Sequence, residues 1–176
     1  MYATLHSAST PPDPRTAAGA AGTVVLAAPD GPGGTLVALW TDPPPAAGAD
    51  DGRVFRVTDV FSGPAAGRRP LYAQVTRLGA DGDPARADAA EHGGRDRIWP
   101  AVRDVEGIVE VLALRSDDSR VVVVGLATDR ETHVAVQRRL AATPLLPDED
   151  PALLPGADRV DVVRVLSADL PTAVRS

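Results

Sequence analysis

Cysteine is absent from this chain of 176 residues, and so are lysine and asparagine. Without cysteine the chain forms no disulfide and offers no thiolate for catalysis or for binding a metal. All 18 basic residues are therefore arginines, against 24 acidic residues, and the net charge is −6. Because contacts with phosphate groups need a basic surface, this charge argues against nucleic acid as the main partner.

Aromatic residues are scarce as well. They make up 3% of the chain, although apolar residues make up 44% and charged residues 24%. That balance is typical of a globular protein, so valine, leucine and alanine must supply most of the core. No window approaches the roughly 18 apolar residues of a transmembrane helix. Residues 1–14 lack the basic start and the long apolar run of a secretory signal. We therefore expect a soluble, cytoplasmic protein that does not bind membranes.

Two stretches of the chain have the same plan. Residues 22–42 read GTVVLAAPDGPGGTLVALWTD, and residues 107–129 read GIVEVLALRSDDSRVVVVGLATD. Each begins with glycine and an apolar run, passes through an Asp-containing turn, becomes apolar again and ends on Thr-Asp, which predicts a β-hairpin. A strand-like segment precedes and follows each hairpin, so each half offers four strands in the same order. These flanking segments are residues 2–6 and 53–57 in the first half, and residues 72–76 and 159–165 in the second.

The second half also contains two predicted helical segments. PARADAAEH, within residues 83–106, is prone to form a helix that the glycine pair at 93–94 is expected to interrupt. Residues 130–142 predict another helix, with Asp129 as its N-cap and Val134, Val136 and Leu140 on its apolar side.

The equivalent intervals of the first half, residues 9–21 and 43–50, are rich in proline, glycine and alanine. They are too short and too broken for a long helix. We therefore predict an α+β fold made of two ferredoxin-like halves. Residues 67–176 form a complete β-α-β-β-α-β unit, and residues 1–66 form a degenerate copy that kept its sheet and lost its helices. Together they would imitate a dimer within one chain.

This arrangement resembles the dimeric α+β barrel superfamily, and within it the antibiotic biosynthesis monooxygenase-like proteins. Three stretches carry the resemblance: VEGIVEVLALRSDDSRVVVVGLATDRET, LAATPLLPDEDPALLPGADRVDVVRV and the N-terminal TLVALWTD. In that family the third strand often ends in Trp followed by a small or acidic residue. Trp40-Thr41-Asp42 keeps this pattern, whereas the second copy has Ala127 in place of the Trp. The resemblance implies an intrachain dimeric α+β barrel.

Family members in polyketide pathways oxidise aromatic phenols or anthrones with O2 and need no metal or flavin. The resemblance therefore implies a cofactor-independent oxygenase acting on an aromatic polyketide-like intermediate. A polyketide cyclase of the same fold stays open, and so does a non-catalytic barrel that binds a small apolar ligand or only assembles. Haem-degrading relatives rely on an Asn, Trp and His set, so the absence of asparagine argues against that activity.

The pocket in such folds lies between the sheet and its own helices, so only the second half is expected to build one. Trp99 either packs at the expected helix kink or forms a flat wall with an indole donor for an aromatic substrate. Tyr72 shares a strand face with Gln74 and is either a lining residue or an ordinary strand aromatic. Inward apolar residues of the stretch 107–114 would complete the lining.

Histidine and arginine supply the remaining candidates. His92 is either a surface residue or a base at the pocket mouth, since histidine titrates near neutral pH. We expect His133 to be exposed on its helix, with a contact to substrate as the alternative. Arg86 faces solvent or stabilises a phenolate. The candidates for catalysis are thus His92, Tyr72 and Trp99, and those for substrate binding are Tyr72, Gln74, Trp99, His133 and Arg86.

The expected partner is a small aromatic or apolar molecule. The three histidines show no HxH, HExxH or similar metal-binding pattern, so neither a metal nor another cofactor is expected. Because the two halves supply both sheets, the chain needs no second copy to close its barrel. The N-terminal sheet would expose Val24, Leu26 and Leu36 unless the Pro-rich linkers cover them, so either a monomer or a homodimer through that face is expected.

Overall fold

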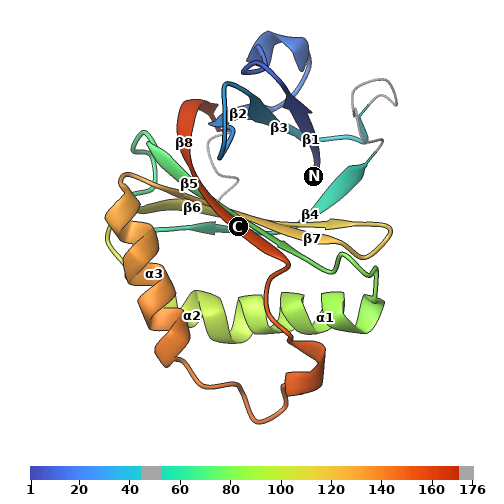
Figure 1. The fold of residues 1–176 in the computed structure, drawn as a ribbon, viewed down its shortest axis with the longest axis vertical. Coiled ribbons are helices and arrows are strands. Elements are labelled where there is room, and N and C mark those ends of the chain that lie inside the picture. Colours follow the sequence, from blue (N-terminus) through green and yellow to red (C-terminus); the bar gives the residue numbers. More distant parts are fainter. Residues whose placement is uncertain (45–52, 171–176) are drawn as a thin grey trace.

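A computed structural model describes residues 1–44 and 53–170 of the chain. Within these residues, eight antiparallel strands close into a barrel in the order β1-β3-β2-β8-β5-β7-β6-β4. The helices lie outside the barrel on one side (Figure 1). The mainly antiparallel α+β fold expected from the sequence is thus confirmed. The strands are β1 (Tyr2–Ala8), β2 (Gly22–Ala27), β3 (Gly34–Trp40), β4 (Val54–Ser62), β5 (Tyr72–Leu78), β6 (Ile108–Ser116), β7 (Val121–Ala127) and β8 (Arg159–Asp169).

The strands fall into two blocks of four neighbours. β1 to β4 lie in the order β4-β1-β3-β2, and β5 to β8 lie in the order β8-β5-β7-β6. Numbered within its own block, each therefore has the order 4-1-3-2 that a ferredoxin-like unit shows. The pairs β2·β8 and β4·β6 join the blocks edge to edge. The eight described strands consequently form one closed barrel, and none of them has an edge left free to pair with another chain.

Alternate side chains along the strands fill the inside of the barrel. Aliphatic residues dominate this core, and Phe55 is its one aromatic residue within the described part of the chain, as the low aromatic content requires. The core therefore depends on close packing of small branched side chains. Its buried strand residues include Ala3, Val24, Leu26, Val37, Leu39, Phe55, Ala73, Val75, Leu112, Leu114, Val122, Val124, Leu126, Val163 and Val165.

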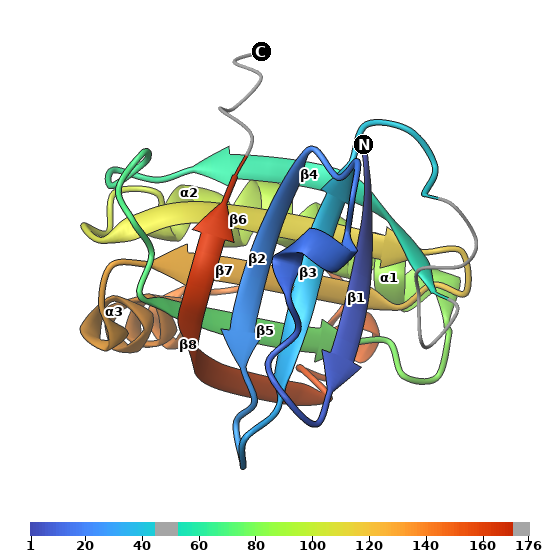
Figure 2. The same ribbon diagram turned by 90° about the horizontal axis from the view of Figure 1, so that it is seen from above.

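The segment between β1 and β2 covers part of the outer face of the first block (Figure 2). A Cβ added at Gly34 would come within 3.2 Å of Pro12 Cδ, so this segment lies directly against β3. Leu36 is 4% exposed on that face, while Val24 and Leu26 point into the barrel and are 0% and 2% exposed. The exposed apolar face that the sequence allowed at these three residues is therefore absent.

Three helices lie against the second block: α1 (Pro84–Gly93), α2 (Trp99–Val102) and α3 (Arg130–Ala142). The Asp129 carboxylate accepts a hydrogen bond from the Thr132 N–H at 2.8 Å, which confirms Asp129 as the N-cap of α3. In the first block, the interval 9–21 contains one short 3₁₀ turn, Pro14–Thr16, and no long helix. Most of the other Pro-rich interval, residues 45–50, lies outside the described residues.

The expected interruption at Gly93 and Gly94 is wrong. Both residues keep right-handed helical angles, and a π-helical turn (Gly94–Ile98) carries α1 directly into α2. Glycine in a helix costs about 1 kcal/mol relative to alanine, which tertiary packing can outweigh. Here a Cβ at Gly93 would clash with Glu149 Oε1. Glycine therefore lets the segment around Glu149 pack against the continuous helix.

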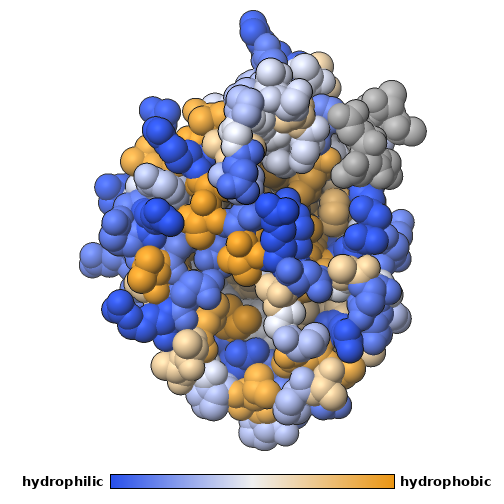
Figure 3. All heavy atoms as spheres, viewed as in Figure 1, coloured by the Kyte–Doolittle hydropathy of each residue, from blue (hydrophilic) through white to orange (hydrophobic). Residues whose placement is uncertain are grey.

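On the face that carries the helices and β8, hydrophobic groups are dispersed among hydrophilic ones (Figure 3). Val160 and Val162 of β8 are 47% and 37% exposed. None of the helices in the described parts of the chain is long and apolar enough to cross a membrane.

Candidate functional site

Side chains of β5 and α3 meet in a layer between the barrel and its helices, called here the helix–sheet layer. Tyr72 and Gln74 point out of the barrel because the intervening Ala73 points into it. The Gln137 side-chain amide on α3 donates a hydrogen bond to Gln74 Oε1 at 2.9 Å. Gln74 Nε2 in turn donates to Thr76 Oγ1 at 3.2 Å. A polar network therefore links β5, one of the two inner strands of the second block, to α3.

His133 belongs to this layer and is buried, with 5% of its surface exposed, so the expected exposure is wrong. Its helix docks through Thr132, His133, Val136 and Leu140, whereas Val134, expected on the apolar side, is 53% exposed. The expected packing of Val136 and Leu140 is thus confirmed, and that of Val134 is wrong.

The surroundings of His133 keep its imidazole neutral. Burial lowers the pKa of His133, against smaller opposing effects of a hydrogen bond to the Tyr72 main chain and of the nearby Asp129 carboxylate. Nε2 has no hydrogen-bond partner among the described residues. Because Nε2 has no partner, we assign the bond to the Tyr72 main chain to Nδ1. A neutral ring that donates from Nδ1 leaves its Nε2 lone pair unused, so His133 has an available proton acceptor in this layer.

Trp99 has different surroundings. Its ring stacks on Phe61 of β4, with centroids 4.9 Å apart and planes inclined by 20°. It packs against a buried apolar cluster of Val102, Val105 and Ile108. Ile108, which the sequence placed in the pocket lining, thus joins this cluster, whereas Leu112 and Leu114 from the same stretch point into the barrel. Trp99 therefore attaches α2 to the β4–β6 side of the barrel.

His92 and Arg86 lie apart from the helix–sheet layer, on α1. His92 is partly exposed, and its ring nitrogens Nδ1 and Nε2 lie 2.8 Å from Asp96 and 3.1 Å from Asp148. Arg86 is paired with Asp81 at the start of the helix. Of the residues singled out in the sequence, the structure thus brings together Tyr72, Gln74 and His133, and it places Trp99, His92 and Arg86 elsewhere.

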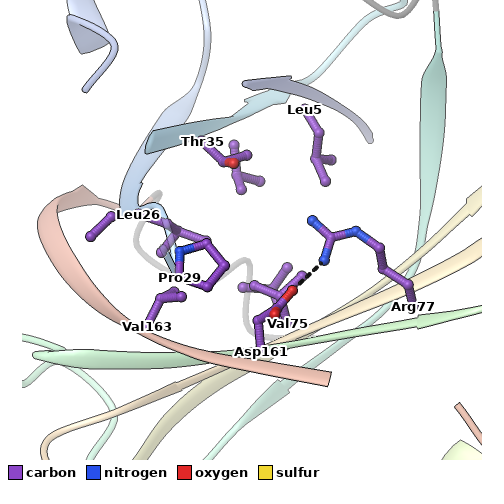
Figure 4. A pocket seen from close by; sticks show the side chains of 11 residues that line it. Leu5, Leu26, Pro29, Thr35, Val75, Arg77, Asp161 and Val163 are labelled. Atoms are coloured by element: carbon purple, nitrogen blue, oxygen red, sulfur yellow. Dashed lines mark hydrogen bonds and ion pairs between the residues drawn. The ribbon is translucent and has the colours of Figure 1, made fainter. Parts of the chain in front are cut away.

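A cavity of about 200 Å³ opens at one end of the barrel, where β1 and β5 end and β4, β7 and β8 begin. A smaller one of about 20 Å³ adjoins it and shares Leu5 and Arg77 (Figure 4). Its close-up shows the ion pair between Arg77 and Asp161 beside aliphatic side chains. The larger cavity is lined by Leu5, Ser7, Arg53, Phe55, Arg77, Leu78, Ala80, Arg120, Val121, Val122, Asp158 and Arg159.

Sequence reasoning missed this barrel-end cavity, because its lining comes from separate segments that no local motif connects. The barrel brings four arginines to the rim of this cavity, where they form two pairs, and the two arginines of each pair share one aspartate. Arg53 and Arg120 lie 3.3 and 3.1 Å from Asp118. A hydrogen bond from the Ser116 hydroxyl and the two arginines hold the pKa of Asp118 below its ordinary value, against the opposing effect of burial. Asp118 therefore stays ionised at neutral pH.

Glu110 is a second residue that the sequence did not single out. It lies opposite Leu126 in the β6–β7 pair, and therefore faces the inside of the barrel as Leu126 does. It is 9% exposed, and burial raises its pKa.

Within the described ranges no group of three or more His, Asp or Glu residues is placed to hold a metal ion.

No protein-family model and no curated protein matches the chain. Solved structures do share its fold. A candidate monooxygenase from Fusobacterium nucleatum subsp. nucleatum matches with a TM-score of 0.55 and 10% identity, over 86% of this chain and 78% of that one. A candidate monooxygenase from Lactobacillus acidophilus matches with a TM-score of 0.55 and 10% identity, over 91% and 85% of the two chains. An anthrone oxidase-like protein matches with a TM-score of 0.50 and 11% identity, over 99% and 96%.

These likenesses define the class of fold: the chain has the α+β barrel architecture that these proteins share. At identities of 10–11% they show the fold alone.

Proposed function

We propose that this protein is a cofactor-independent monooxygenase that oxidises a small aromatic substrate in the helix–sheet layer. The observation that carries the proposal is the buried, neutral His133, whose Nε2 has no partner among the described residues. The shared fold with two candidate monooxygenases and an anthrone oxidase-like protein supports it. An aromatic polyketide-like intermediate is the proposed substrate class.

In the proposed reaction, His133 Nε2 removes a proton from the acidic position of a phenol or anthrone. The resulting electron-rich anion passes electrons to O2 without help from a metal. For an anthrone, one oxygen atom becomes the new carbonyl and the other leaves as water with the two hydrogens of the oxidised carbon, so one O2 is consumed per quinone formed. Tyr72 and Gln74 would donate hydrogen bonds to the oxygen that becomes negative.

The neutral state of His133 matters for this chemistry, because only the unprotonated ring accepts a proton. A base inside a water-poor layer also meets little competition from solvent for its lone pair. Since Nε2 is itself covered, the substrate is proposed to enter between β5 and α3 by displacing the side chains there, among them the Gln74–Gln137 bridge.

The organisation into two halves is part of the proposal. We infer that residues 67–176 are the catalytic half and that residues 1–66 are a copy without helices, which completes the barrel. The shared 4-1-3-2 order of the two strand blocks supports this inference. Only the second half would then carry an active site, because His133, Tyr72 and Gln74 all belong to it.

The test is incubation with an anthrone under air, in buffer treated with a metal chelator, with O2 uptake and product formation followed together. The proposal predicts one O2 consumed per anthraquinone formed, with no hydrogen peroxide. A cyclase of the same fold would leave the anthrone unchanged and would instead close a ring in an open-chain polyketone with loss of water, so ring closure of such a substrate without O2 uptake would favour that alternative. Binding of the anthrone without turnover would favour a non-catalytic barrel.

A further inference from the structure

The barrel-end cavity lies apart from the proposed active site. It is lined by residues that face the barrel interior and by the loops at one barrel end, whereas His133 belongs to α3, outside the barrel. We propose that this cavity binds a small aromatic carboxylate, with the ring against the apolar floor and the carboxylate against the arginines of the rim. The inference does not rest on the proposed oxygenase activity.

The charges of the rim are unbalanced. Arg53 and Arg120 share Asp118, and Arg77 and Arg159 share Asp161. The one acidic side chain in the lining of the larger cavity, Asp158, accepts a hydrogen bond from the Ala80 N–H at 2.9 Å. Four guanidinium groups therefore face three carboxylates. The chain as a whole has a net charge of −6, so an anion is attracted to this site by its local excess of positive charge and is repelled by most of the remaining surface.

The guanidinium groups also have donors to spare. Arg53, Arg120 and Arg159 each bind their aspartate through Nε. The terminal nitrogens of these three side chains have no hydrogen-bond partner among the described residues, although each guanidinium carries five N–H donors. Pairs of terminal N–H groups match the two oxygens of a carboxylate, and such bidentate pairs are stronger than neutral hydrogen bonds. The rim is thus equipped for a carboxylate.

Size and polarity favour an aromatic body for the ligand. The cavity floor includes Leu5, Phe55 and Val122, and the last two are each 5% exposed members of the barrel core. An apolar cavity of about 150 Å³ is large enough for benzene. The volume of about 200 Å³ here accommodates one such ring. A ligand with a ring and an adjacent carboxylate would use both parts of the cavity.

Benzoate is the probe that tests this. It is titrated into the full chain by calorimetry, beside benzyl alcohol, which keeps the ring without the charge, and acetate, which keeps the charge without the ring. We expect benzoate to bind at least tenfold more tightly than either, with an affinity that falls as salt is added. Absence of benzoate binding, or equal binding of benzyl alcohol or acetate, would overturn the proposal.

The variant R53Q/R120Q removes two rim charges, and R15Q/R68Q is its matched control, because it removes two charges from exposed residues outside the cavity lining. We expect R53Q/R120Q to weaken benzoate binding at least tenfold and R15Q/R68Q to leave it within twofold. Should R53Q/R120Q fail to fold, Arg159→Gln tests the same rim through a side chain that is 57% exposed. Unchanged benzoate affinity in a folded rim variant contradicts the proposal.

Two further variants locate the ligand. Asp158→Asn removes the carboxylate that lines the larger cavity and keeps an oxygen for the Ala80 N–H, so it should tighten benzoate binding. His133→Gln should leave benzoate binding unchanged, because the residue lies outside the barrel. Loss of benzoate binding in His133→Gln would place the ligand in the helix–sheet layer and overturn the inference. If His133→Gln loses oxygenase activity but binds benzoate as wild type does, the result supports a benzoate site separate from the proposed active site.

Discussion

At the scale of single residues, two buried ionisable side chains differ in their location and in the direction of their pKa shifts. Glu110 faces the inside of the barrel from β6, and burial raises its pKa. His133 lies in the helix–sheet layer, where burial is the largest effect and lowers its pKa. Both shifts favour the neutral form, because a charge loses its hydration when it is buried. The two residues therefore make opposite contributions to the pH dependence of stability.

Replacing Glu110 with glutamine should stabilise the protein at neutral and alkaline pH. The folded chain holds the Glu110 proton more tightly than the unfolded chain does, so wild-type stability is lost as the pH rises from the ordinary value of 4.5 through the folded-state pKa. At pH 8 we expect Glu110→Gln to gain on the order of 1 kcal/mol, or about 2–4 °C in Tm. Thermal unfolding at pH 4 and pH 8 checks this, and a variant less stable than wild type at pH 8 refutes it.

For His133 we expect the opposite dependence of stability on pH. Its folded-state pKa lies below the ordinary value of 6.5, so stability is lost as the pH falls from 6.5 toward that lower pKa. NMR titration of the ring should show that His133 remains neutral at pH 6.5, with the proton on Nδ1. Between pH 7.5 and pH 5, His133→Gln should lose less stability than wild type. A ring that titrates at or above 6.5 would contradict the neutral base.

Part of this residue-scale detail was accessible from the sequence. Asp129 is recognisable as an N-cap because a helix start needs a side-chain acceptor for its free N–H groups. The burial of His133 was not accessible, because Val134 beside it is the more apolar residue and yet faces solvent. Which face of a short helix docks depends on the surface it meets. A helix of mixed polarity does not specify that face by its own pattern.

At the scale of elements, the helix from α1 to α2 and the segment around Glu149 stabilise one another. Arg97, in the π-helical turn, donates to both carboxylate oxygens of Glu149 at 3.0 and 2.7 Å. Their side chains are 12% and 1% exposed, and the Glu149 carboxylate also accepts the Leu146 N–H. Gly93 leaves room for this carboxylate. A buried ion pair of this kind depends on every partner keeping its position.

The adjacent glycines provide a matched pair of variants. Gly93→Ala places a Cβ against Glu149 Oε1 and should destabilise the protein by about 1–3 kcal/mol. Gly94→Ala meets nothing within 4 Å and should be neutral or stabilise the helix by about 0.5–1 kcal/mol. Both are measured by chemical unfolding. Equal effects of the two substitutions would show that the contact with Glu149 does not determine the need for glycine.

The strands were predictable from the sequence, whereas the continuity of the helix through Gly93 and Gly94 was not. Alternation of apolar residues in a hairpin reports burial directly, so the hairpins β2–β3 and β6–β7 were found. A glycine pair indicates only that the backbone is locally free to adopt many conformations. The neighbour that requires glycine at position 93, Glu149, is more than 50 residues away along the chain. The rim of the barrel-end cavity was missed for the same reason, because its arginines are brought together only when the barrel closes.

At the scale of the whole molecule, the barrel depends on both strand blocks. β8 pairs with β2 and β6 pairs with β4, so neither block has its edges satisfied without the other. Core residues of both blocks also belong to one buried cluster. The two strand blocks therefore share the core inside the barrel, although their strand orders repeat.

Unfolding should accordingly be a single cooperative transition. We expect the urea transitions followed by far-UV circular dichroism and by tryptophan fluorescence to coincide, since Trp40 and Trp99 report on the first block and on α2 respectively. Light scattering should show a monomer or a dimer, because the closed barrel needs no further copy. Two separate transitions, or a trimer or larger assembly, would contradict this account.

The central claim is that His133 acts as the base of an O2-consuming reaction in the helix–sheet layer. The direct measurement is the initial rate of O2 uptake with an anthrone substrate, compared between wild type, His133→Gln and the control His6→Gln on β1. General-base catalysis contributes about 10²–10⁴-fold, so His133→Gln should lose activity on that order while remaining folded. His6→Gln should keep its activity. O2 uptake by folded His133→Gln at the wild-type rate would contradict the claim.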